Sequence, residues 1–512
     1  MRLKARLLGF ATGGTGVVVL DDDVAKQLGV HPLDRVRIKY DGKEVLAIVN
    51  VAKRLPLDEV ALYDEVAEAL GVKEGAFVDV EPVEPPRSIA YVRNKLRGAR
   101  LGRDEIFEIV RDIVRGALND VEIAALVVTL HHQGLSMEEA YYFTLAMVET
   151  GERLELGKRP VLDKHSLGGI PGDKTTLLLV PIIASLGYTI PKTSSRAITS
   201  PAGTADRFET LAPVNLTVEE MKEVVLKTGG CIVWGGALRL APADDLIIRV
   251  EYPLALDPFF IPSIMAKKAA VGSTHVVLDI PIGRDAKVST VAQGERLAKD
   301  FMELGARLGM RVEVALTFGD QPLGYAVGPA LEAREALLAL RTGRPEDLVN
   351  KAVRLAGILL GMVGVGNGQA LAREALRTGR AEAKLREIIE AQGGNPNVRP
   401  EDIPIGREVA EIKSEKRGRV LYINNRAIAQ IARVAGAPRD KGAGILLKVK
   451  LGDYVNIGDT LMEIYAEKGY KLDLAMKLAE ETSPIVVGEY HEIVLLKHVP
   501  ALPPPSLPEL ER

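Results

Sequence analysis

The sequence predicts a multidomain α/β protein, and three observations support this fold class. The chain has 512 residues, whereas a single hydrophobic core stops growing at roughly 250 to 300 residues. From about residue 160 onward, short apolar runs, glycine turns and helical patterns alternate, which is typical of a mostly parallel sheet covered by helices. Strand patterns also occupy both ends of the chain. We therefore expect a central α/β unit with a further domain on either side.

The first predicted domain is a small β module at residues 1–84. Four runs rich in β-branched residues, VVVLDDD, RVRIKY, EVLAIVNVAK and GAFVDVEPV, are separated by Gly, Asp and Pro turns. The period then changes, because apolar residues in DEIFEIVRDIVRGALND recur at helical spacing, with Asp104 as the expected cap. Two more helical segments follow, around DVEIAALVVTLHHQG and SMEEAYYFTLAMVETG. Residues 86–150 are therefore predicted to be helical.

The alternation that begins at about residue 160 predicts the central α/β unit, and the family resemblance described below implies its bounds, 155–239 and 273–400. Its apolar strands include PVLD and RVEVALTFG, and its helices include TVAQGERLAKDFMELGARLG and ALEAREALLALRTG. Beyond about residue 405 strands return in RGRVLYINN and GAGILLKVKLGDYVNIGDTLMEIYAE, which predicts an α+β domain at 405–498. The Pro-rich end, 499–512, is expected to be a disordered tail.

Composition excludes several classes of protein. The 66 Lys and Arg residues against 69 Asp and Glu give a formal net charge of -3, so nucleic acid is not an expected partner. No uncharged run reaches the roughly 18 residues that span a membrane, and the N-terminus lacks the apolar core of a signal peptide. The only cysteine, Cys231, has apolar neighbours and is expected to be a buried thiol. We expect a cytoplasmic protein without membrane partners.

The segment VLDKHSLGGIPGDKTTLLLVPIIASLG, residues 161–187, carries the main functional signal. Between a strand and a helix, such a loop directs backbone N–H groups and the helix dipole at one place, where a phosphate binds well. Three glycines let the backbone come close, and five side chains offer donors: Gly168, Gly169, Gly172, Lys164, His165, Ser166, Thr175 and Thr176. The alternatives are a purely structural turn and a solvated Lys174. Pro181 is expected to kink the helix or delay its start.

Two better-known phosphate loops do not fit this segment. The nucleoside triphosphate loop needs a lysine directly after its last glycine, but Asp173 stands between Gly172 and Lys174. The glycine spacing also differs from that of the dinucleotide fingerprint. A second donor cluster, TSSRAITSPAGT at residues 193–204, supplies one arginine and several hydroxyls. Its alternative interpretation is a set of ordinary caps and turns.

At these two segments the sequence strongly resembles the thymidine and pyrimidine nucleoside phosphorylase family. The motifs are KHSLGGIPGDK, SSRAITSPAGT, GGALRLAPADD and SIMAKK, and the resemblance covers roughly residues 88 to 500. Pro171 lengthens the phosphate loop, SSRAIT replaces a more glycine-rich segment, and the N-terminal β module is additional. These departures match the archaeal AMP phosphorylase branch. That branch converts a nucleoside 5'-monophosphate (AMP, also CMP or UMP) and inorganic phosphate into free base and ribose 1,5-bisphosphate.

The resemblance implies a helical lobe that faces a mixed, mostly parallel-sheet α/β lobe across a cleft. The helical lobe would comprise residues 86–150 and 240–272 and would form a homodimer or a higher homo-oligomer. The C-terminal domain looks like the barrel-sandwich module of biotinyl domains. It lacks the Met-Lys-Met hairpin of those domains, because Lys477 follows Met476 in a helical context. No cofactor and no metal are expected.

The family pattern also implies roles for individual residues. Asp257 would protonate the departing base, since apolar neighbours raise the pKa of a carboxyl group, and His165 would lie beside phosphate and sugar. The implied phosphate-binding residues are Lys164, Ser166, Gly168, Gly169, Thr176, Ser194 and Thr204. The nucleotide-binding candidates are Gly169, Ser194, Ser195, Arg196, Ala197, Ile198, Thr199, Gly203, Thr204, Ser263, Lys267 and Lys287. Arg249 roughly matches a base-binding arginine.

Alternatives stay open at this point. Asp257 precedes Pro258 and fits an ordinary turn, Lys287 fits a solvated surface lysine, and Arg196 fits a residue that orients its own loop. A pyrimidine nucleoside phosphorylase without a 5'-phosphate requirement is the second functional hypothesis. A phosphoribosyltransferase that uses pyrophosphate chemistry and magnesium is the third, and a non-catalytic nucleotide-binding module is the fourth.

Overall fold

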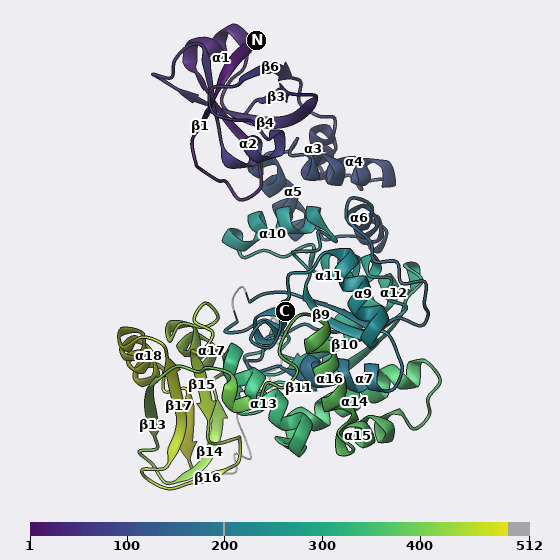
Figure 1. Ribbon diagram of the computed structural model, residues 1–512, viewed down its shortest axis with the longest axis vertical. Coiled ribbons are helices and arrows are strands. Elements are labelled where there is room, and N and C mark those ends of the chain that lie inside the picture. The colour runs from purple at the N-terminus through teal and green to yellow at the C-terminus, as the bar shows by residue number, and fades with distance from the viewer. Residues whose placement is uncertain (198–199, 490–512) are drawn as a thin grey trace, which may run out of the picture.

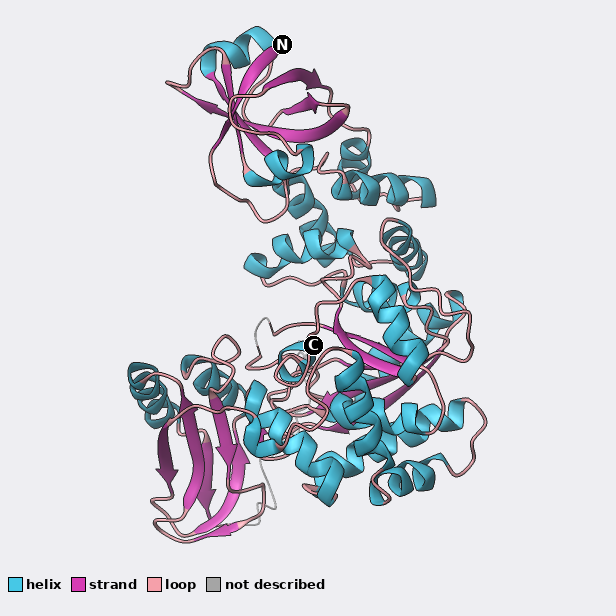
Figure 2. Ribbon diagram, viewed as in Figure 1, coloured by secondary structure: helices cyan, strands magenta, loops and turns pink. Residues whose placement is uncertain are grey.

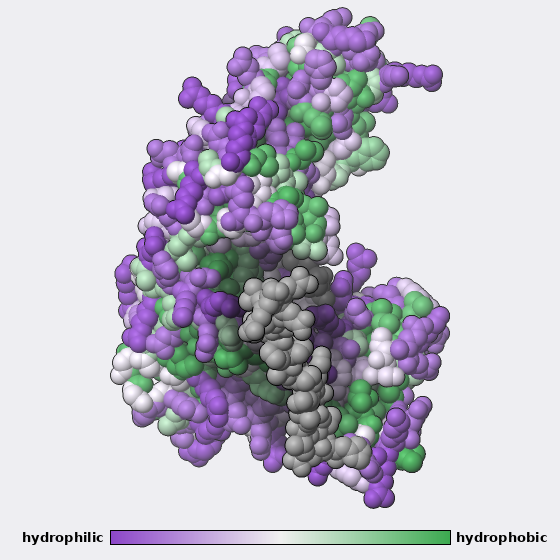
Figure 3. Space-filling view, turned by 180° about the vertical axis from the view of Figure 1, so that it is seen from behind, coloured by the Kyte–Doolittle hydropathy of each residue, from purple (hydrophilic) through white to green (hydrophobic). Residues whose placement is uncertain are grey.

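The computed structural model describes residues 1–197 and 200–489 of the chain. The molecule is elongated and bent (Figure 1): the N-terminal barrel lies at one end, the α/β unit at the other, and the C-terminal domain beside the α/β unit. Strands gather in three separate places, with helices between them (Figure 2). The bent outline is also clear in the space-filling view from behind (Figure 3).

The N-terminal module is a closed six-stranded barrel with the strand order β1-β5-β2-β4-β3-β6. Alternate residues such as Val36 and Ile38 point into its core and are fully buried. Its strands are β1 Arg2–Leu7, β2 Val17–Asp21, β3 Arg35–Tyr40, β4 Lys43–Ala52, β5 Glu59–Leu62 and β6 Phe77–Val83. Two short helices, α1 Asp22–Leu28 and α2 Asp64–Leu70, were not predicted.

Six helices form the helical lobe: α3 Ser88–Leu96, α4 Arg103–Val114, α5 Asp120–Gln133, α6 Met137–Glu149, α10 Pro242–Leu254 and α11 Phe260–Ala270. The prediction that Asp104 caps α4 is wrong. Gly102 is the N-cap residue, and its N–H donates to the Glu105 side chain at 2.8 Å, which satisfies an otherwise unpaired backbone donor. Lys95 and Glu139 form a buried ion pair at 2.6 Å that ties α3 to α6.

Arg249 of α10 connects the barrel to the helical lobe. Its guanidinium donates to Asp120 Oδ1 at 2.6 Å and to Thr15 Oγ1 at 2.7 Å. These partners tie Arg249 to the barrel, and the base-binding match suggested for it stays a prediction. The buried Arg35 of the barrel makes a second link, to Glu122 of α5.

The α/β unit is built on parallel strand pairs in the orders β11-β10-β7 and β8-β9, and a parallel bridge between Val161 and Thr189 joins the two groups. The strands are β7 Leu162–Ser166, β8 Ile190–Ser194, β9 Gly230–Trp234, β10 His275–Ile282 and β11 Arg311–Phe318. The helices are α7 Thr175–Ser185, α8 Thr204–Phe208, α9 Val218–Thr228, α12 Val291–Arg307, α13 Pro329–Thr342, α14 Glu346–Met362, α15 Gly368–Arg377 and α16 Arg380–Ala391. Pro181 lies inside α7 and does not delay its start.

The C-terminal domain contains two sheets, with the orders β12-β15-β17-β13 and β16-β14-β18. Its elements are β13 Glu408–Lys413, β14 Gly418–Ile423, α17 Asn425–Val434, β15 Gly444–Leu447, β16 Tyr454–Val455, β17 Thr460–Ala466, α18 Gly469–Thr482 and β18 Ile485–Gly488, after the 3-10 turn η1 Pro400–Asp402. Strand β12, Ala326–Val327, comes from the α/β part of the chain. Lys477 lies in α18, as expected.

The predicted fold class is confirmed, with a parallel α/β unit, a helical unit, an N-terminal β module and a C-terminal α+β domain. Cys231 in β9 is fully buried, as predicted. None of the helices in residues 1–197 and 200–489 combines the length and the apolar character that a membrane crossing requires. The tail at 499–512 lies outside the described residues.

Candidate functional site

The loop after β7 brings several predicted donors to the end of the parallel sheet. Lys164, His165 and Ser166 are the last three residues of β7. The next turn needs its glycines, because the φ angles of Gly168, Gly169 and Gly172 are 72°, 95° and 77°.

Gly169 also allows a close approach to a second loop. A Cβ atom on Gly169 would lie 2.5 Å from the backbone nitrogen of Lys287. The structure thus places the backbone of Lys287, predicted from a distant part of the chain, against the loop after β7.

Two lysines and two aspartates form a buried charge network below this loop. Lys164 Nζ lies 3.7 Å from Asp173 Oδ2 and 3.9 Å from Asp279 Oδ2, and Lys351 Nζ lies 2.7 Å from Asp279 Oδ2. Burial alone would raise the pKa of Asp173, but the charges of Lys164 and Lys351 hold it well below its usual range. Asp173 also accepts from the Thr175 hydroxyl at 2.6 Å. Asp173, whose presence distinguishes this loop from the nucleoside triphosphate loop, therefore anchors the first turn of α7.

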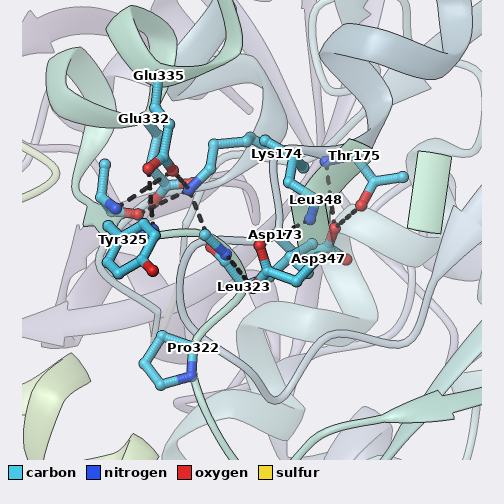
Figure 4. A network of polar contacts seen from close by, with 12 residues as sticks. Asp173, Lys174, Thr175, Pro322, Leu323, Tyr325, Glu332, Glu335, Asp347 and Leu348 are labelled. Atoms are coloured by element: carbon cyan, nitrogen blue, oxygen red, sulfur yellow. Dashed lines mark hydrogen bonds and ion pairs between the residues drawn. The ribbon is translucent and has the colours of Figure 1, made fainter. Parts of the chain in front are cut away.

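Lys174 is a structural residue, so the solvated-lysine alternative is wrong. Its side chain is fully buried and donates to the carbonyl oxygens of Leu323 and Ala326, both at 2.9 Å. It also pairs with Glu335, and Figure 4 shows it reaching between that carboxylate and Leu323. A Cβ on Gly172 would lie 2.6 Å from Leu323 O. The loop after β7 thus packs directly on segment 322–327.

The surroundings of His165 are strongly cationic. Burial lowers the pKa of His165 well below its ordinary value, and the charges of Lys268 and Lys192 act in the same direction. Burial and Lys268 likewise hold the pKa of Lys192 well below its usual range. Asp163 balances part of this charge, since Lys268 Nζ lies 2.8 Å from its carboxylate. His165 is therefore neutral near pH 7, and an anion would be favoured beside it.

The second donor cluster is held together by one carboxylate. Asp206 Oδ2 accepts from the N–H of Ala197 at 2.7 Å and from the N–H of Gly203 at 2.9 Å. A Cβ on Gly203 would lie 2.5 Å from Ser195 O. The two ends of the loop therefore lie side by side, and both amides already have a partner.

Arg196 orients this loop, in agreement with the alternative raised from the sequence. Its guanidinium binds Glu209 at 2.8 and 2.5 Å and lies 4.9 Å above the ring of Trp234. The Ser194 hydroxyl donates to Val233 O at 2.9 Å, and the Thr204 hydroxyl accepts from Arg207 at 3.3 Å. Ile198 and Thr199 lie outside the described residues.

The helical lobe contributes a group of carboxylates around Asp257, which lies between α10 and α11. Burial raises the pKa of Asp257; the charge of Asp244 adds to this rise, whereas Lys287 and Lys267 oppose it. Burial also raises the pKa of Asp245 to about 6. Lys267 Nζ pairs with the fully buried Asp244 at 2.6 Å.

Lys287 connects the two lobes at this place. It belongs to the loop after β10, and its Nζ lies 5.5 Å from the ring centroid of Phe260 in α11. The charge of Lys287 acts both on Asp257 of the helical lobe and on His165 of the α/β unit, and the charge of Lys267 also acts on Asp257. Ser263 lies half-buried one turn before Lys267 on α11.

Comparisons with known proteins follow the same division of the chain. Residues 89–151 match the model of the glycosyl transferase family helical bundle domain, residues 158–382 match its a/b domain, and residues 419–486 match the pyrimidine nucleoside phosphorylase C-terminal domain. An AMP phosphorylase of Thermofilum pendens is 55% identical over 508 residues, 99% of each chain. The chain belongs to the AMP phosphorylase family. The AMP phosphorylase of Pyrococcus furiosus is 49% identical over 493 residues, 95% of this chain and 98% of that protein.

A solved structure shares the fold at low sequence identity. Anthranilate phosphoribosyltransferase from Thermus thermophilus superposes with a TM-score of 0.51 at 22% identity, covering 59% of this chain and 98% of that one. This likeness concerns the fold alone. The family resemblance stated from the sequence motifs is confirmed by the relatives.

Sequence reasoning missed Lys192, Lys268, Lys351 and Asp206. Lys268 stands beside Lys267 in SIMAKK, and Lys192 stands in the strand before the second cluster, so both had a positional signal. Lys351 lies inside an ordinary helical pattern of α14 and had none. Within the described part of the chain, no group of three or more His, Cys, Asp or Glu side chains is arranged to hold a metal ion.

Proposed function

We propose that the protein catalyses phosphorolysis of nucleoside 5'-monophosphates, AMP and also CMP and UMP, to free base and ribose 1,5-bisphosphate. The observation that carries this proposal is the meeting of a carboxyl group of raised pKa, Asp257, with the cationic surroundings of His165 and Lys287. Near-complete matches to AMP phosphorylases support it.

The proposed reaction replaces the base at C1' by phosphate. An oxygen of inorganic phosphate forms the new bond to C1' while the bond from C1' to the base nitrogen breaks, and the electron pair leaves with the base. Asp257 donates its proton to the base as the charge develops, which its raised pKa favours. The carboxylate is protonated again from water or from the incoming phosphate in the next cycle.

Positioning of phosphate is the main task proposed for the α/β unit. We assign the attacking phosphate to the residues around the loop after β7: Lys164, His165, Ser166, Gly168, Gly169, Thr176, Ser194 and Thr204. Lys268 adds positive charge there, which stabilises the anion before and during attack, and a bound phosphate would favour the charged form of Lys192, whose pKa is lowered in its absence. We assign nucleotide binding to Ser263 and Lys267 on the helical side of the site, and to Ser195 on the side of the second loop.

Lys287 is our candidate for the 5'-phosphate, and it gives the decisive test. Base release is measured by chromatography with AMP, adenosine, UMP and uridine, each with inorganic phosphate, and the bisphosphate product is identified by mass. One hydrogen bond to a charged group is worth about 1.5 to 3 kcal/mol, so Lys287→Met is expected to narrow the AMP-to-adenosine preference by about 10- to 100-fold. The exposed Lys299 of α12 supplies the control variant, Lys299→Met.

Each alternative predicts a different result. Equal rates on monophosphates and nucleosides in the unmodified protein would favour a nucleoside phosphorylase. A reaction that uses pyrophosphate chemistry and stops when magnesium is chelated would favour a phosphoribosyltransferase. We also propose a homodimer, which sedimentation velocity would detect, and a cytoplasmic location. The proposed helical lobe comprises residues 86–150 and 240–272, and the proposed α/β lobe comprises residues 155–239 and 273–400.

A further inference from the structure

The C-terminal domain lies next to the α/β unit (Figure 1), and some of its side chains bind residues close to the loops that carry the proposed donors. Three of its polar side chains, Tyr422, Lys441 and Lys450, leave their own domain to bind residues of that unit. Each of the three binds next to a different donor loop.

Tyr422 of β14 holds the loop that carries Lys287. Its hydroxyl lies 2.5 Å from Asp285 Oδ2, and the guanidinium carbon of Arg284 lies 4.9 Å from its ring centroid. Asp285 and Arg284 are two and three residues before Lys287. A shift of this contact therefore moves the backbone that places the Lys287 ammonium.

Lys441, in the segment between α17 and β15, reaches the carboxylates that close the second loop. Its Nζ lies 2.7 Å from Glu209 Oε2 and 3.3 Å from Asp206 Oδ1. Asp206 holds the two loop ends, and Glu209 holds Arg196. Side-chain hydrogen bonding to Arg196, with further contributions from Lys441, lowers the pKa of Glu209 to about 2.

Lys450 binds the segment on which the loop after β7 packs. Its Nζ donates to Pro322 O at 2.7 Å, to Gly324 O at 2.5 Å and to Asp347 Oδ2 at 2.9 Å. Lys174, two residues after Gly172, binds the neighbouring carbonyls of the same segment. Two lysines from two domains thus fix one short segment on which the phosphate loop packs.

We propose that Tyr422, Lys441 and Lys450 are positioning residues through which the C-terminal domain sets the geometry of the phosphate and nucleotide sites. The kinetic part of its test rests on the proposed function, since it measures release of base from AMP. None of the three side chains touches the reacting atoms; each acts through a loop residue. The two units also meet through an apolar contact, because Val327 and Tyr325 of the α/β part pack into the core of the C-terminal domain, but the three polar side chains reach beyond that core to the donor loops.

The chain offers matched controls for two of these residues. Lys448 has the same side-chain exposure as Lys441, 35%, but pairs with Glu463 inside the C-terminal domain. Tyr454 makes a hydroxyl contact of the same length as that of Tyr422, 2.5 Å, but to Arg417 of its own domain. Lys448→Met and Tyr454→Phe therefore remove an equivalent side-chain contact without touching a donor loop.

The test compares kinetics and amide hydrogen exchange in the full-length variants. Lys441→Met is expected to raise KM for AMP about tenfold with a smaller change in kcat, and Lys441→Arg to restore it, as fits one charge-assisted contact. Tyr422→Phe is expected to narrow the AMP-to-adenosine preference about threefold to tenfold. Lys450→Met is expected to raise KM for phosphate. Exchange is expected to quicken at residues 200–204 in Lys441→Met and at 283–288 in Tyr422→Phe, but in neither control.

The outcomes separate this inference from the proposed function. Unchanged KM values and unchanged exchange in all three variants would overturn the positioning role, as would a lower melting temperature alone. If the unmodified protein released no base from AMP, the proposed function would fail, while the exchange measurements would still decide whether the C-terminal domain orders the loops.

Discussion

Glu251 of α10 is expected to destabilise the protein at alkaline pH. Its side chain is 4% exposed, and within the described residues its Oε1 has no hydrogen-bond partner. Burial, assisted by the charge of Asp257, raises its pKa from 4.5 to about 8. The folded protein therefore favours the protonated carboxyl group. Ionisation opposes folding increasingly as the pH rises from 4.5 to about 8, and this opposition stays constant above that.

The size of the effect follows from the interval between the two pKa values. At about 1.4 kcal/mol per pH unit, the interval gives an upper limit of about 5 kcal/mol, which access of water to the carboxylate reduces. Glu251→Gln keeps the shape of the protonated group and cannot ionise. We expect this variant to match the unmodified protein at pH 5 and to unfold at a temperature several degrees higher at pH 9.

Thermal unfolding followed by circular dichroism from pH 5 to 9 measures this difference. The exposed Glu155 provides the control, Glu155→Gln, for which no comparable pH-dependent gain is expected. A difference between the Glu251→Gln variant and the unmodified protein that stayed the same at pH 5 and pH 9 would refute the reasoning.

Three further predictions concern the site and the core. Asp257→Asn is expected to lower kcat about 10²- to 10⁴-fold with less effect on AMP binding, and an Asn variant with full turnover would remove Asp257 from the mechanism. Because the pKa of Asp257 is raised and its protonated form acts, base release by the unmodified enzyme is expected to fall as pH rises through that pKa. Lys164→Met is expected to raise the phosphate concentration for half-maximal rate and to destabilise the fold by about 3 to 5 kcal/mol, since Asp173 and Asp279 lose a buried counter-charge. An unchanged dependence of the rate on phosphate concentration would make the loop structural. Burial raises the pKa of the Cys231 thiol, so native protein is expected to resist alkylation and to be labelled only on unfolding, which mass spectrometry detects; rapid native labelling would contradict the buried position.

Local patterns predicted the elements that bear the site, because strand, glycine turn and helix follow one another directly in residues 161–187. They did not predict α1, whose first turn is formed by the aspartates of VVVLDDD. In the sequence those aspartates resemble a turn after a strand, whereas in the structure Asp21 accepts from Asp23 N and begins a helix.

The partners of the site residues could not be predicted in the same way. Lys164 and Lys351 share Asp279 across 187 residues of chain, and no spacing rule connects them. The sequence indicated that Lys174 was a lysine near a phosphate loop, but only the fold shows that two backbone carbonyls and Glu335 occupy its ammonium group. Residue types were thus predictable, while their pairing depended on tertiary packing.

The strand that the α/β part contributes to the C-terminal sheet has a consequence for dissecting the protein. Ala326 and Val327 pair with Leu446 and Ile445 at the edge of the sheet β12-β15-β17-β13. A fragment that began near residue 405 would lack this strand and would expose the unpaired N–H and C=O groups of β15, which invites edge-to-edge association. The C-terminal folding unit is therefore not one continuous stretch of chain, because its sheet is completed by a strand that precedes it by about eighty positions. A fragment with soluble behaviour would have to carry residues 326–327 as a grafted strand.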